Sequence, residues 1–214
     1  MITIAVIMYN QNDFLEKHCN YFKSFAGNNQ IIFLDDGSNK SLIPQDFEYY
    51  RHPHVNFGHA GLCNIAVKLA KGKLILLLDG DTFLPENFSE EYKKFENENI
   101  IAFYRDGLEP NGDIIKDNKK NDMPYYCHAT MSATIWDTKQ VREIGFNENY
   151  KYGLADFEMA LRLLGEKKVK FMDVRALHIS HAKNIYDVDN GKDKLKFKEL
   201  EIKLLGKSYL FGGV

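Results

Sequence analysis

Residues 74–81 read Leu-Ile-Leu-Leu-Leu-Asp-Gly-Asp, an unbroken apolar run that ends in an acidic triplet. Such a run is typical of a strand that is buried on both faces, as the strands of a parallel sheet are. Residues 2–8 and 31–34 form similar runs, and helical spacing of apolar residues marks residues 12–25 and 60–70 between the runs. Because strand and helix patterns alternate, the sequence predicts an α/β fold built on a parallel sheet.

Acidic residues follow two of these strands, at the point where each strand ends. In an open α/β sheet ligands bind beyond the carboxyl ends of the strands, so the residues that follow the strands are expected to share one edge. They are Tyr9 and Asn10 after the first strand, Asp35 and Asp36 after the second, and Asp79, Gly80 and Asp81 after the third. A divalent cation would join such carboxylates, because hard cations bind carboxylate and phosphate oxygens together. The alternative is that each aspartate only caps a turn.

The composition excludes some function classes. The formal net charge is −2 and the sequence pI is near 6.4, whereas a general nucleic-acid-binding domain usually carries a basic face. The three cysteines, Cys19, Cys63 and Cys127, match neither a zinc site nor a disulfide framework, which indicates a reducing compartment. The longest apolar run, residues 74–78, is too short to span a membrane. We therefore expect a soluble, cytoplasmic protein, of a bacterium or of a virus-infected host cell, without nucleic-acid partners.

Over roughly residues 2–182 the sequence resembles the family-2 glycosyltransferases of the GT-A fold. The resemblance rests on fragments that occur in the family's order: residues 6–10, the DDGS element at 35–38, the N-x-G, N-x-A and A-x-G elements that include Gly58 and Asn64, and the DxD triplet at 79–81. It implies the GT-A fold, an α/β fold with a mixed, mainly parallel central sheet flanked by helices. The residue usage, rich in Asn, Lys, Ile and Phe, suggests a low-GC bacterial or large-virus source, and the chain also resembles the N-terminal domain of a chlorella-virus glycosyltransferase.

The resemblance implies a binding site for a UDP-sugar donor. Tyr9 would stack on the uracil and Asp35 would contact the base. Asp79 would face the ribose or the water shell of a metal, while Asp81 would ligate Mn²⁺ (or Mg²⁺) that bridges both phosphates. The further donor-binding residues that the resemblance implies are Asn10, Asp36, Gly58, Asn64 and Gly80. The metal would act as a Lewis acid on the departing nucleoside diphosphate.

A second segment, residues 152–158, resembles the family's G-x-E-D-x-E element. By this resemblance Asp156 is the general base of an inverting transfer to a glycan hydroxyl, and Glu158 is a further candidate site residue. Ala155 stands where the family usually has glutamate, which puts acceptor binding in question. Without the resemblance, Asp156 and Glu158 could simply complement the N-terminus of a helix.

Histidines supply the remaining metal candidates. Several GT-A enzymes place a third ligand on a late strand, which implies His181 here, with His178 as a second candidate. Residues i and i+3 lie on opposite faces of a strand, so both can ligate only if the chain turns. His59 could touch phosphate, although an exposed loop position is the alternative for His59 and for His52 and His54.

Three aromatic residues, Tyr125, Tyr126 and Trp136, could stack against sugar faces in an acceptor groove, and for Trp136 core packing is an equal alternative.

One domain of residues 1–214 is expected, with a nucleotide-sugar-binding half at 1–98, an acceptor and catalytic half at 99–182 and a C-terminal helix at 183–214. It could be one domain of a longer multidomain chain. Two rival functions remain open: a nucleotide-sugar-binding module without efficient transfer, and a phosphatase of the haloacid-dehalogenase type, in which Asp79 would attack phosphate.

Overall fold

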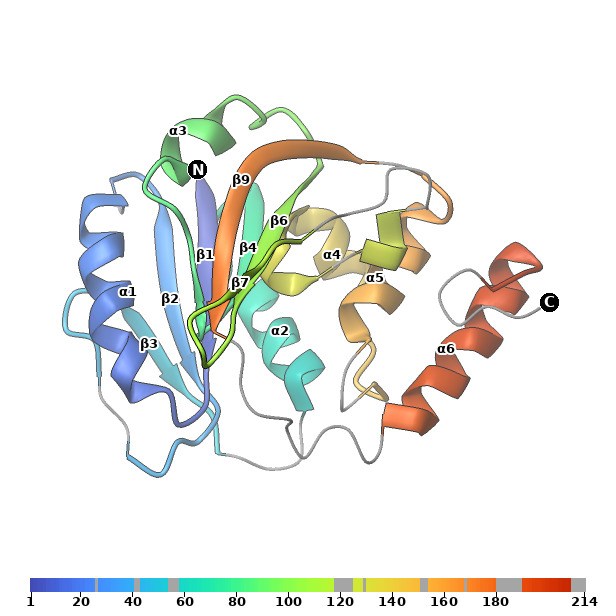
Figure 1. The fold of residues 1–214 in the computed structure, drawn as a ribbon, viewed down its shortest axis with the longest axis horizontal. Coiled ribbons are helices and arrows are strands. Elements are labelled where there is room, and N and C mark those ends of the chain that lie inside the picture. The colour runs from blue at the N-terminus through green and yellow to red at the C-terminus, as the bar shows by residue number, and fades with distance from the viewer. Residues whose placement is uncertain are drawn as a thin grey trace.

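A mixed β-sheet forms the centre of the protein (Figure 1). The computed structural model describes residues 1–25, 27–40, 43–53, 58–117, 125–128, 130–150, 154–167, 169–179 and 190–208. Within these residues the strands are β1 (Ile2–Met8), β2 (Gln30–Asp35), β3 (Glu48–Arg51), β4 (Leu74–Asp79), β5 (Thr82–Phe83), β6 (Ile100–Leu108), β7 (Ile114–Ile115), β8 (Thr134–Asp137) and β9 (Lys170–Ile179). The strand order is β3-β2-β1-β4-β8-β6-β9-β5, and β7 pairs with β6. Strands of both predicted halves therefore belong to one sheet.

Helices cover both faces of the sheet. The helices are α1 (Asn12–Phe25), α2 (Gly58–Leu69), α3 (Phe88–Lys93), α4 (Thr138–Ile144), α5 (Ala155–Leu164) and α6 (Asn190–Leu205), with two short 3₁₀ helices, η1 (Tyr125–His128) and η2 (Met131–Ala133). One apolar core contains residues of α1 and α3, and the other contains residues of α2, α4, α5 and α6. The helices thus bury the apolar strands from both sides.

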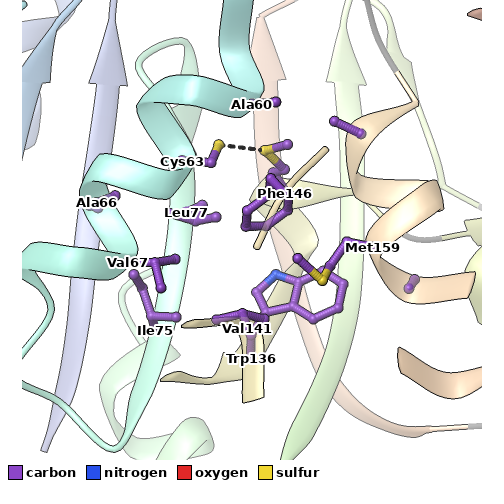
Figure 2. Close-up of a cluster of buried hydrophobic side chains, with 14 of the residues drawn as sticks. Ala60, Cys63, Ala66, Val67, Ile75, Leu77, Trp136, Val141, Phe146 and Met159 are labelled. Atoms are coloured by element: carbon purple, nitrogen blue, oxygen red, sulfur yellow. Dashed lines mark hydrogen bonds between the residues drawn. The ribbon is translucent and has the colours of Figure 1, made fainter. Parts of the chain in front are cut away.

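Strands β1, β2 and β4 show why the apolar runs are unbroken. Along β1, Ala5 and Ile7 belong to the core beneath α2, whereas Ile4 and Val6 belong to the core beneath α1. Successive side chains of a strand point to opposite faces, so a strand that is covered on both sides needs apolar residues at every position. The core beside α2 is shown in Figure 2, where residues of α2, β4, α4 and α5 meet around Trp136.

The register of the parallel strands brings their carboxyl ends to one edge. β1 lies between β2 and β4 and is parallel to both. Met8 pairs with Asp35, and Ile7 pairs with Asp79. The α/β fold with a mixed sheet flanked by helices is confirmed, and β1 to β4 are parallel to one another as the sequence predicted. The pairings of β5, β7 and β8 are antiparallel.

Some predicted elements differ from the structure. The sequence pattern of residues 130–136 predicts a strand, but the first part of this segment is the 3₁₀ helix η2, and β8 begins only at Thr134. The strands β3 and β5 were not expected. The turn near Gly112 does join two antiparallel strands, β6 and β7, and Asp137 caps α4 by accepting a hydrogen bond from the backbone N–H of Gln140 (2.9 Å).

The long strand β9 links the far side of the sheet to the acidic triplet. It runs parallel to β6 with an irregularity near residues 102–104, and its last residues pair with β5 in the register Thr82↔His178 and Phe83↔Leu177. Because β5 follows Asp81 directly, this pairing brings the end of β9 beside the triplet.

Within the described residues, no helix has the length and apolar character needed to cross a membrane.

Candidate active site

Aspartates from two parallel strands lie at the carboxyl edge of the sheet, as the sequence predicted. The chain turns after each strand by a backbone hydrogen bond to β1: the N–H of Asp36 donates to the carbonyl of Met8 (2.9 Å), and the N–H of Gly80 donates to the carbonyl of Ile7 (2.8 Å). Both acidic clusters are therefore fixed to the same central strand.

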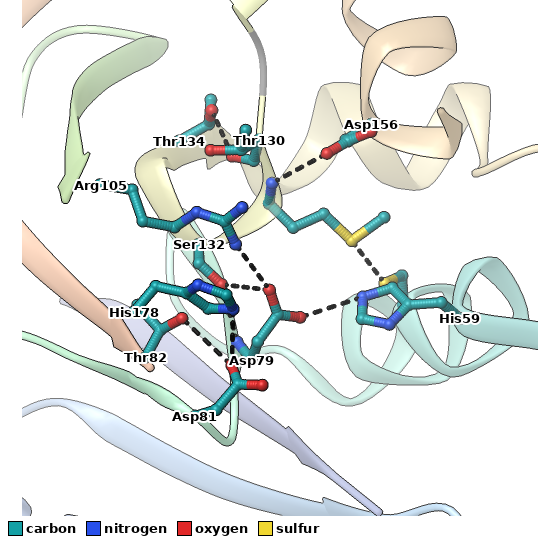
Figure 3. A network of polar contacts seen from close by, with 12 residues as sticks. His59, Asp79, Asp81, Thr82, Arg105, Thr130, Ser132, Thr134, Asp156 and His178 are labelled. Carbon is teal, nitrogen blue, oxygen red and sulfur yellow. Dashed lines mark hydrogen bonds and ion pairs between the residues drawn. The ribbon is translucent and has the colours of Figure 1, made fainter. Parts of the chain in front are cut away.

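The carboxylate of Asp79 is held by side chains from three other elements (Figure 3). The hydroxyl of Ser132 accepts a hydrogen bond from the backbone N–H of Asp79 and donates one to its Oδ2, both at 2.8 Å. Arg105 Nη1 donates to the same oxygen at 3.3 Å, and His59 Nε2 lies 3.5 Å from Oδ1. The predicted candidate His59 is thus part of the site.

Asp81 lies beside the end of β9 and is almost fully buried. Its Oδ2 accepts a hydrogen bond from the side-chain amide of Gln11 (3.0 Å), and its Oδ1 lies 3.5 Å from His178 Nε2. The backbone carbonyl of Asp81 accepts from the N–H of Ile179 (2.9 Å). The structure therefore joins Asp81 with the histidine that the sequence ranked second, while His181 lies outside the described residues.

Gly80, between the two aspartates, is closely packed. A Cβ added there would lie 2.5 Å from Gln11 Oε1 and 3.0 Å from Met8 Cγ. From α1, His18 Nε2 donates a hydrogen bond to the carbonyl of Gly80 (2.9 Å), and the His18 ring stacks on Phe83 with 4.8 Å between the ring centroids. Burial lowers the pKa of His18, so the imidazole is neutral near pH 7 and the donating nitrogen carries its proton.

Asp81 and His178 offer one carboxylate and one imidazole to a divalent cation. Among the described residues there is no group of three or more His, Cys, Asp or Glu side chains placed to hold a metal ion. The two side chains fit a divalent cation that takes its remaining ligands from phosphate oxygens and water, since Mn²⁺ and Mg²⁺ prefer oxygen ligands and keep open positions.

The residues that follow β1 and β2 are tied to each other. The backbone N–H of Asn10 donates to Ser38 Oγ (2.8 Å), and the side-chain oxygen of Asn10 accepts from the N–H of Asn39 (2.9 Å). Asn10 has a positive φ of 53°, which asparagine tolerates better than most residues. These contacts hold the turn so that Tyr9, which is 41% exposed, stands at the sheet edge.

The side chain of Asp35 is buried beneath this turn. It accepts hydrogen bonds from the N–H of Ser38 (2.8 Å) and from the hydroxyl of Tyr49 (2.8 Å). The neighbouring Asp36 is more accessible, and its Oδ1 lies 4.0 Å from His52 Nδ1. Asp35 therefore shapes the DDGS turn, while Asp36 faces the more open side.

Asp156 reaches the site from the first turn of α5. Its Oδ1 accepts from the N–H of Phe157 (2.9 Å), and its Oδ2 accepts from the N–H of Met131 (3.3 Å). Met131 and Ser132 are adjacent in η2, so this one helical turn contacts both Asp156 and Asp79. Burial raises the pKa of Asp156 to about 6, while its hydrogen bond from the N–H of Phe157 and the charges of His59 and Arg105 act in the opposite direction. A carboxylate with such a pKa is suited to accept a proton near neutral pH.

Two of the predicted donor-binding residues, Gly58 and Asn64, belong to α2. Asn64 donates to the carbonyl of Phe146 (2.9 Å) and to Glu148 Oε1 (2.9 Å), and accepts from the N–H of Phe146 (2.7 Å). Its amide therefore holds the loop after α4, and the contact of Asn64 with the donor stays a prediction. Gly58 is the first residue of α2.

Glu158 points away from Asp156 along the helix. Both of its carboxylate oxygens accept from Arg162 at 2.7 Å, and Arg162 in turn donates to the carbonyl of Gly145 (2.6 Å). This buried ion pair joins α5 to the end of α4. Glu158 thus has a structural role, and its participation in the site stays a prediction.

The expectation that three aromatic residues line an acceptor groove is wrong. Trp136, Tyr125 and Tyr126 are at most 2% exposed and belong to the core. Trp136 lies in β8 beneath α4, and the hydroxyl of Tyr126 donates to Glu201 of α6 (2.7 Å). Trp136 is a core residue, which was the alternative to a sugar-stacking role.

Sequence reasoning missed three residues of the site: Gln11, Arg105 and Ser132. Each is an isolated polar residue, and only the tertiary fold shows its partner. One signal was present for Arg105 and Asp106, since two adjacent charged residues in a β-strand of an otherwise apolar sheet need partners. Asp106 is paired with Arg175 (2.7 Å) and Arg105 with Asp79.

An α/β fold with a mixed sheet flanked by helices is the architecture of the GT-A glycosyltransferases. The family model described as "Glycosyl transferase family 2" matches residues 3–153. The chain belongs to this family. The fold and the family do not support the phosphatase alternative.

Solved structures of S. aureus TarS share this fold. The structure of TarS 1-349 in complex with UDP-GlcNAc matches with a TM-score of 0.74 at 13% identity, over 94% of this chain and 66% of that chain. The same TarS fragment in complex with UDP matches with a TM-score of 0.68 at 14% identity, over 84% of this chain and 60% of that chain. A longer TarS structure is matched over only 36% of its length. The chain thus spans about two thirds or less of these relatives.

No curated protein sequence matches the chain. The resemblance to a chlorella-virus glycosyltransferase domain stays a prediction.

Proposed function

We propose that the protein is a metal-dependent, inverting glycosyltransferase that moves a sugar from a UDP-sugar to a glycan hydroxyl. The observation that carries this proposal is the meeting of Asp79, Asp81 and Asp156 at one edge of the sheet. The first two come from the DxD turn, and the third is a carboxylate whose pKa is raised to about 6. In this proposal the site for the nucleoside diphosphate would lie beside a proton acceptor, which is what direct displacement at a sugar carbon needs.

The donor would lie along the carboxyl edge. Tyr9 offers an exposed ring for the base, and the turn that follows β2 is hydrogen-bonded to the next residue, Asn10. The proposal that the nucleotide is UDP is supported by the TarS structures in complex with UDP-GlcNAc and with UDP, whose fold the chain shares. The sugar itself is not specified by these contacts.

The divalent cation, Mn²⁺ or Mg²⁺, would be held by Asp81 and His178, with His181 as a further candidate ligand. When bound, it would supply Lewis-acid stabilisation of the departing diphosphate. Gln11 orients the carboxylate of Asp81 from the protein side through its hydrogen bond of 3.0 Å.

Asp156 would take the proton from the acceptor hydroxyl as that oxygen attacks the sugar. Its two backbone hydrogen bonds, from Phe157 and Met131, fix the carboxylate without neutralising it. Inversion would follow from a single displacement in which the acceptor attacks from the face opposite the diphosphate.

A thermal-shift panel of nucleoside diphosphates and UDP-sugars, each with and without MnCl₂, tests this function. We expect UDP with Mn²⁺ to raise the Tm of the wild-type protein, and Asp81→Ala to abolish the shift while retaining a cooperative transition, because ligand binding to the native state stabilises it. Glu16→Ala, an exposed change on α1, is the matched control and should shift as the wild type does. Absence of a shift with every nucleotide would reject the proposal.

A second function, binding of a nucleotide sugar without efficient transfer, is favoured by Ala155. This residue replaces the usual glutamate and is buried in the core at 3% exposure, so it offers no polar group to an acceptor. Measuring UDP release with and without a mixture of oligosaccharide acceptors separates the two functions. Release that no acceptor accelerates would favour the binding module.

The chain's match to only part of the TarS structures supports the further proposal that it acts as one domain of a longer chain.

A further inference from the structure

Arg105 places a permanent positive charge next to the DxD turn. Its backbone is anchored in β6, where its N–H donates to Asp117 Oδ2 (3.0 Å). Its side chain extends to β4, where Nη1 donates to Asp79 Oδ2 at 3.3 Å. Figure 3 shows His178 and His59 on opposite sides of Asp79. The guanidinium also lowers the pKa of Asp156, so its charge acts on both carboxylates.

The contact with Asp79 uses only one nitrogen of the Arg105 guanidinium. A guanidinium has five N–H donors in a fixed fork, and the side chain of Arg105 is only 28% exposed. Among the described residues, Asp79 is its hydrogen-bond partner, through one nitrogen. A partly buried cation with spare donors is matched to an anion with several oxygens, because bidentate pairing satisfies these donors together.

Asp79 is itself too firmly fixed to be a mobile counterion. The Ser132 hydroxyl bridges the backbone N–H and Oδ2 of Asp79, which fixes the rotamer of the side chain. Ser132 is fully buried and cannot move aside without disturbing the core. Asp79 therefore acts as a fixed support that holds the guanidinium at the sheet edge.

We propose that Arg105 binds a phosphate of the donor's diphosphate directly, with Asp79 as the residue that positions it. This inference rests on the proposed function, since it names a contact within the same donor site. The guanidinium beside Asp79 would stabilise the negative charge that develops on the diphosphate as the bond to the sugar breaks. This stabilisation would add to that of a metal held by Asp81 and His178.

Calorimetric titrations of uridine, UMP and UDP at one fixed MnCl₂ concentration test the contact. For Arg105→Gln we expect the Kd for UDP to rise by about 10- to 100-fold, as for the loss of a charge-assisted hydrogen bond. The Kd for uridine should stay within about twofold, because uridine lacks phosphate. Arg105→Lys should give an intermediate loss for UDP, since an ammonium retains the charge but cannot pair bidentately.

Arg175→Gln is the matched control. It removes the same charge from the adjacent strand β9, where the guanidinium of Arg175 pairs with Asp106 and packs over Tyr104. It should leave the UDP affinity within about twofold of the wild type.

Unchanged UDP affinity in Arg105→Gln would overturn the inference and would point to an acceptor anion or a purely structural ion pair. Equal losses of affinity for uridine and for UDP would also overturn it. If Arg105→Gln does not fold, Arg105→Lys decides by the same ratio of UDP to uridine affinity. A wild-type protein that binds no nucleoside diphosphate would overturn the proposed function as well, so the two failures are distinguishable.

Discussion

Asp79 and Asp81 are two residues apart, yet their surroundings give them different roles. The carboxylate of Asp79 is shared among Ser132, Arg105 and His59, three protein partners that fix it. Asp81 instead faces Gln11 and the end of β9, where an imidazole stands 3.5 Å away. Asp79 is thus fixed by the protein, while its predicted role toward the ribose or the water shell of a metal stays a prediction.

Asp156 carries a prediction about pH at the same scale. Its pKa in the folded protein, about 6, lies above the ordinary value of 3.8, so burial penalises the charged form. The stability that this shift contributes is fully present below about pH 4 and is lost as the pH rises through about 6. We therefore expect Asp156→Asn to be more stable than the wild type at pH 8, by about 1–3 kcal/mol, and the difference to vanish near pH 4.

Urea unfolding followed by circular dichroism at pH 4 and pH 8 measures this difference. UDP release from a donor sugar should fall about tenfold per unit below pH 6 in the wild type, because the base must be ionised, and should be nearly absent in the variant at every pH. Equal stability of the two proteins at pH 8 would contradict the assigned environment of Asp156.

Among the elements, α1 has a role that its sequence pattern did not indicate. Its apolar residues pack into the core, as their helical spacing predicted, but its polar residues also reach the DxD turn from behind. Gln11, just before the helix, contacts Asp81, and His18, in the middle of the helix, contacts the carbonyl of Gly80. The helix and the residue before it therefore support the turn through two polar contacts.

His18→Ala tests this support. The substitution removes a buried hydrogen bond to Gly80 and the stacking on Phe83, and leaves a cavity, so we expect a loss of about 2–4 kcal/mol in the free energy of unfolding. It should also weaken UDP binding, because the turn loses its support. Glu16→Ala, on the exposed face of α1, is the control and should change stability by less than about 0.5 kcal/mol. A variant as stable as the wild type would show that the contact is dispensable.

At the scale of the whole molecule, α6 is docked onto the body through a few buried side chains. Phe197 and Glu201 are fully buried, and Glu201 accepts a hydrogen bond from Tyr126 of η1 (2.7 Å). Phe197 also lies 6.2 Å from the ring of Tyr126. Because the core beside α2 includes Phe197, the helix contributes to the stability of the sheet that carries the site.

Phe197→Ala should therefore destabilise the protein by about 3–5 kcal/mol, as loss of a buried aromatic side chain does. Leu195→Ala, on the same helix but 60% exposed, is the matched control and should have almost no effect. Chemical denaturation of both variants measures the difference. Equal effects would mean that α6 does not pack on the body in solution.

The parts of the fold that could be read from the sequence are those set by local patterns. Unbroken apolar runs predicted β1, β2 and β4, and the aspartates at their ends predicted the acidic edge, because parallel strands bring their carboxyl ends together. The two-residue strand β5 has no such pattern, since its partner His178 lies far along the chain.

Polar contacts between residues far apart in the sequence could not be predicted either. The residues that hold the site lie 26, 53 and 70 positions from their partners in the Arg105–Asp79, Ser132–Asp79 and Gln11–Asp81 contacts. No spacing rule relates such pairs, because their proximity depends on the order of strands in the sheet. The structure also showed which aromatic residues are buried, where size and polarity alone left Trp136 undecided.

The pairing of β5 with β9 has a consequence for the newly made chain. The DxD turn is synthesised early, whereas Ser132, Asp156 and His178 follow later in the sequence. At about 5–20 residues per second, several seconds or more separate the emergence of Asp79 from that of His178 at the ribosome. Early in that interval Asp79 lacks Ser132, which lies 53 residues further along the chain, and throughout it Asp81 lacks its contact with His178. The nascent chain therefore cannot gain stability from a nucleotide sugar in the surrounding medium until β9 has left the exit tunnel.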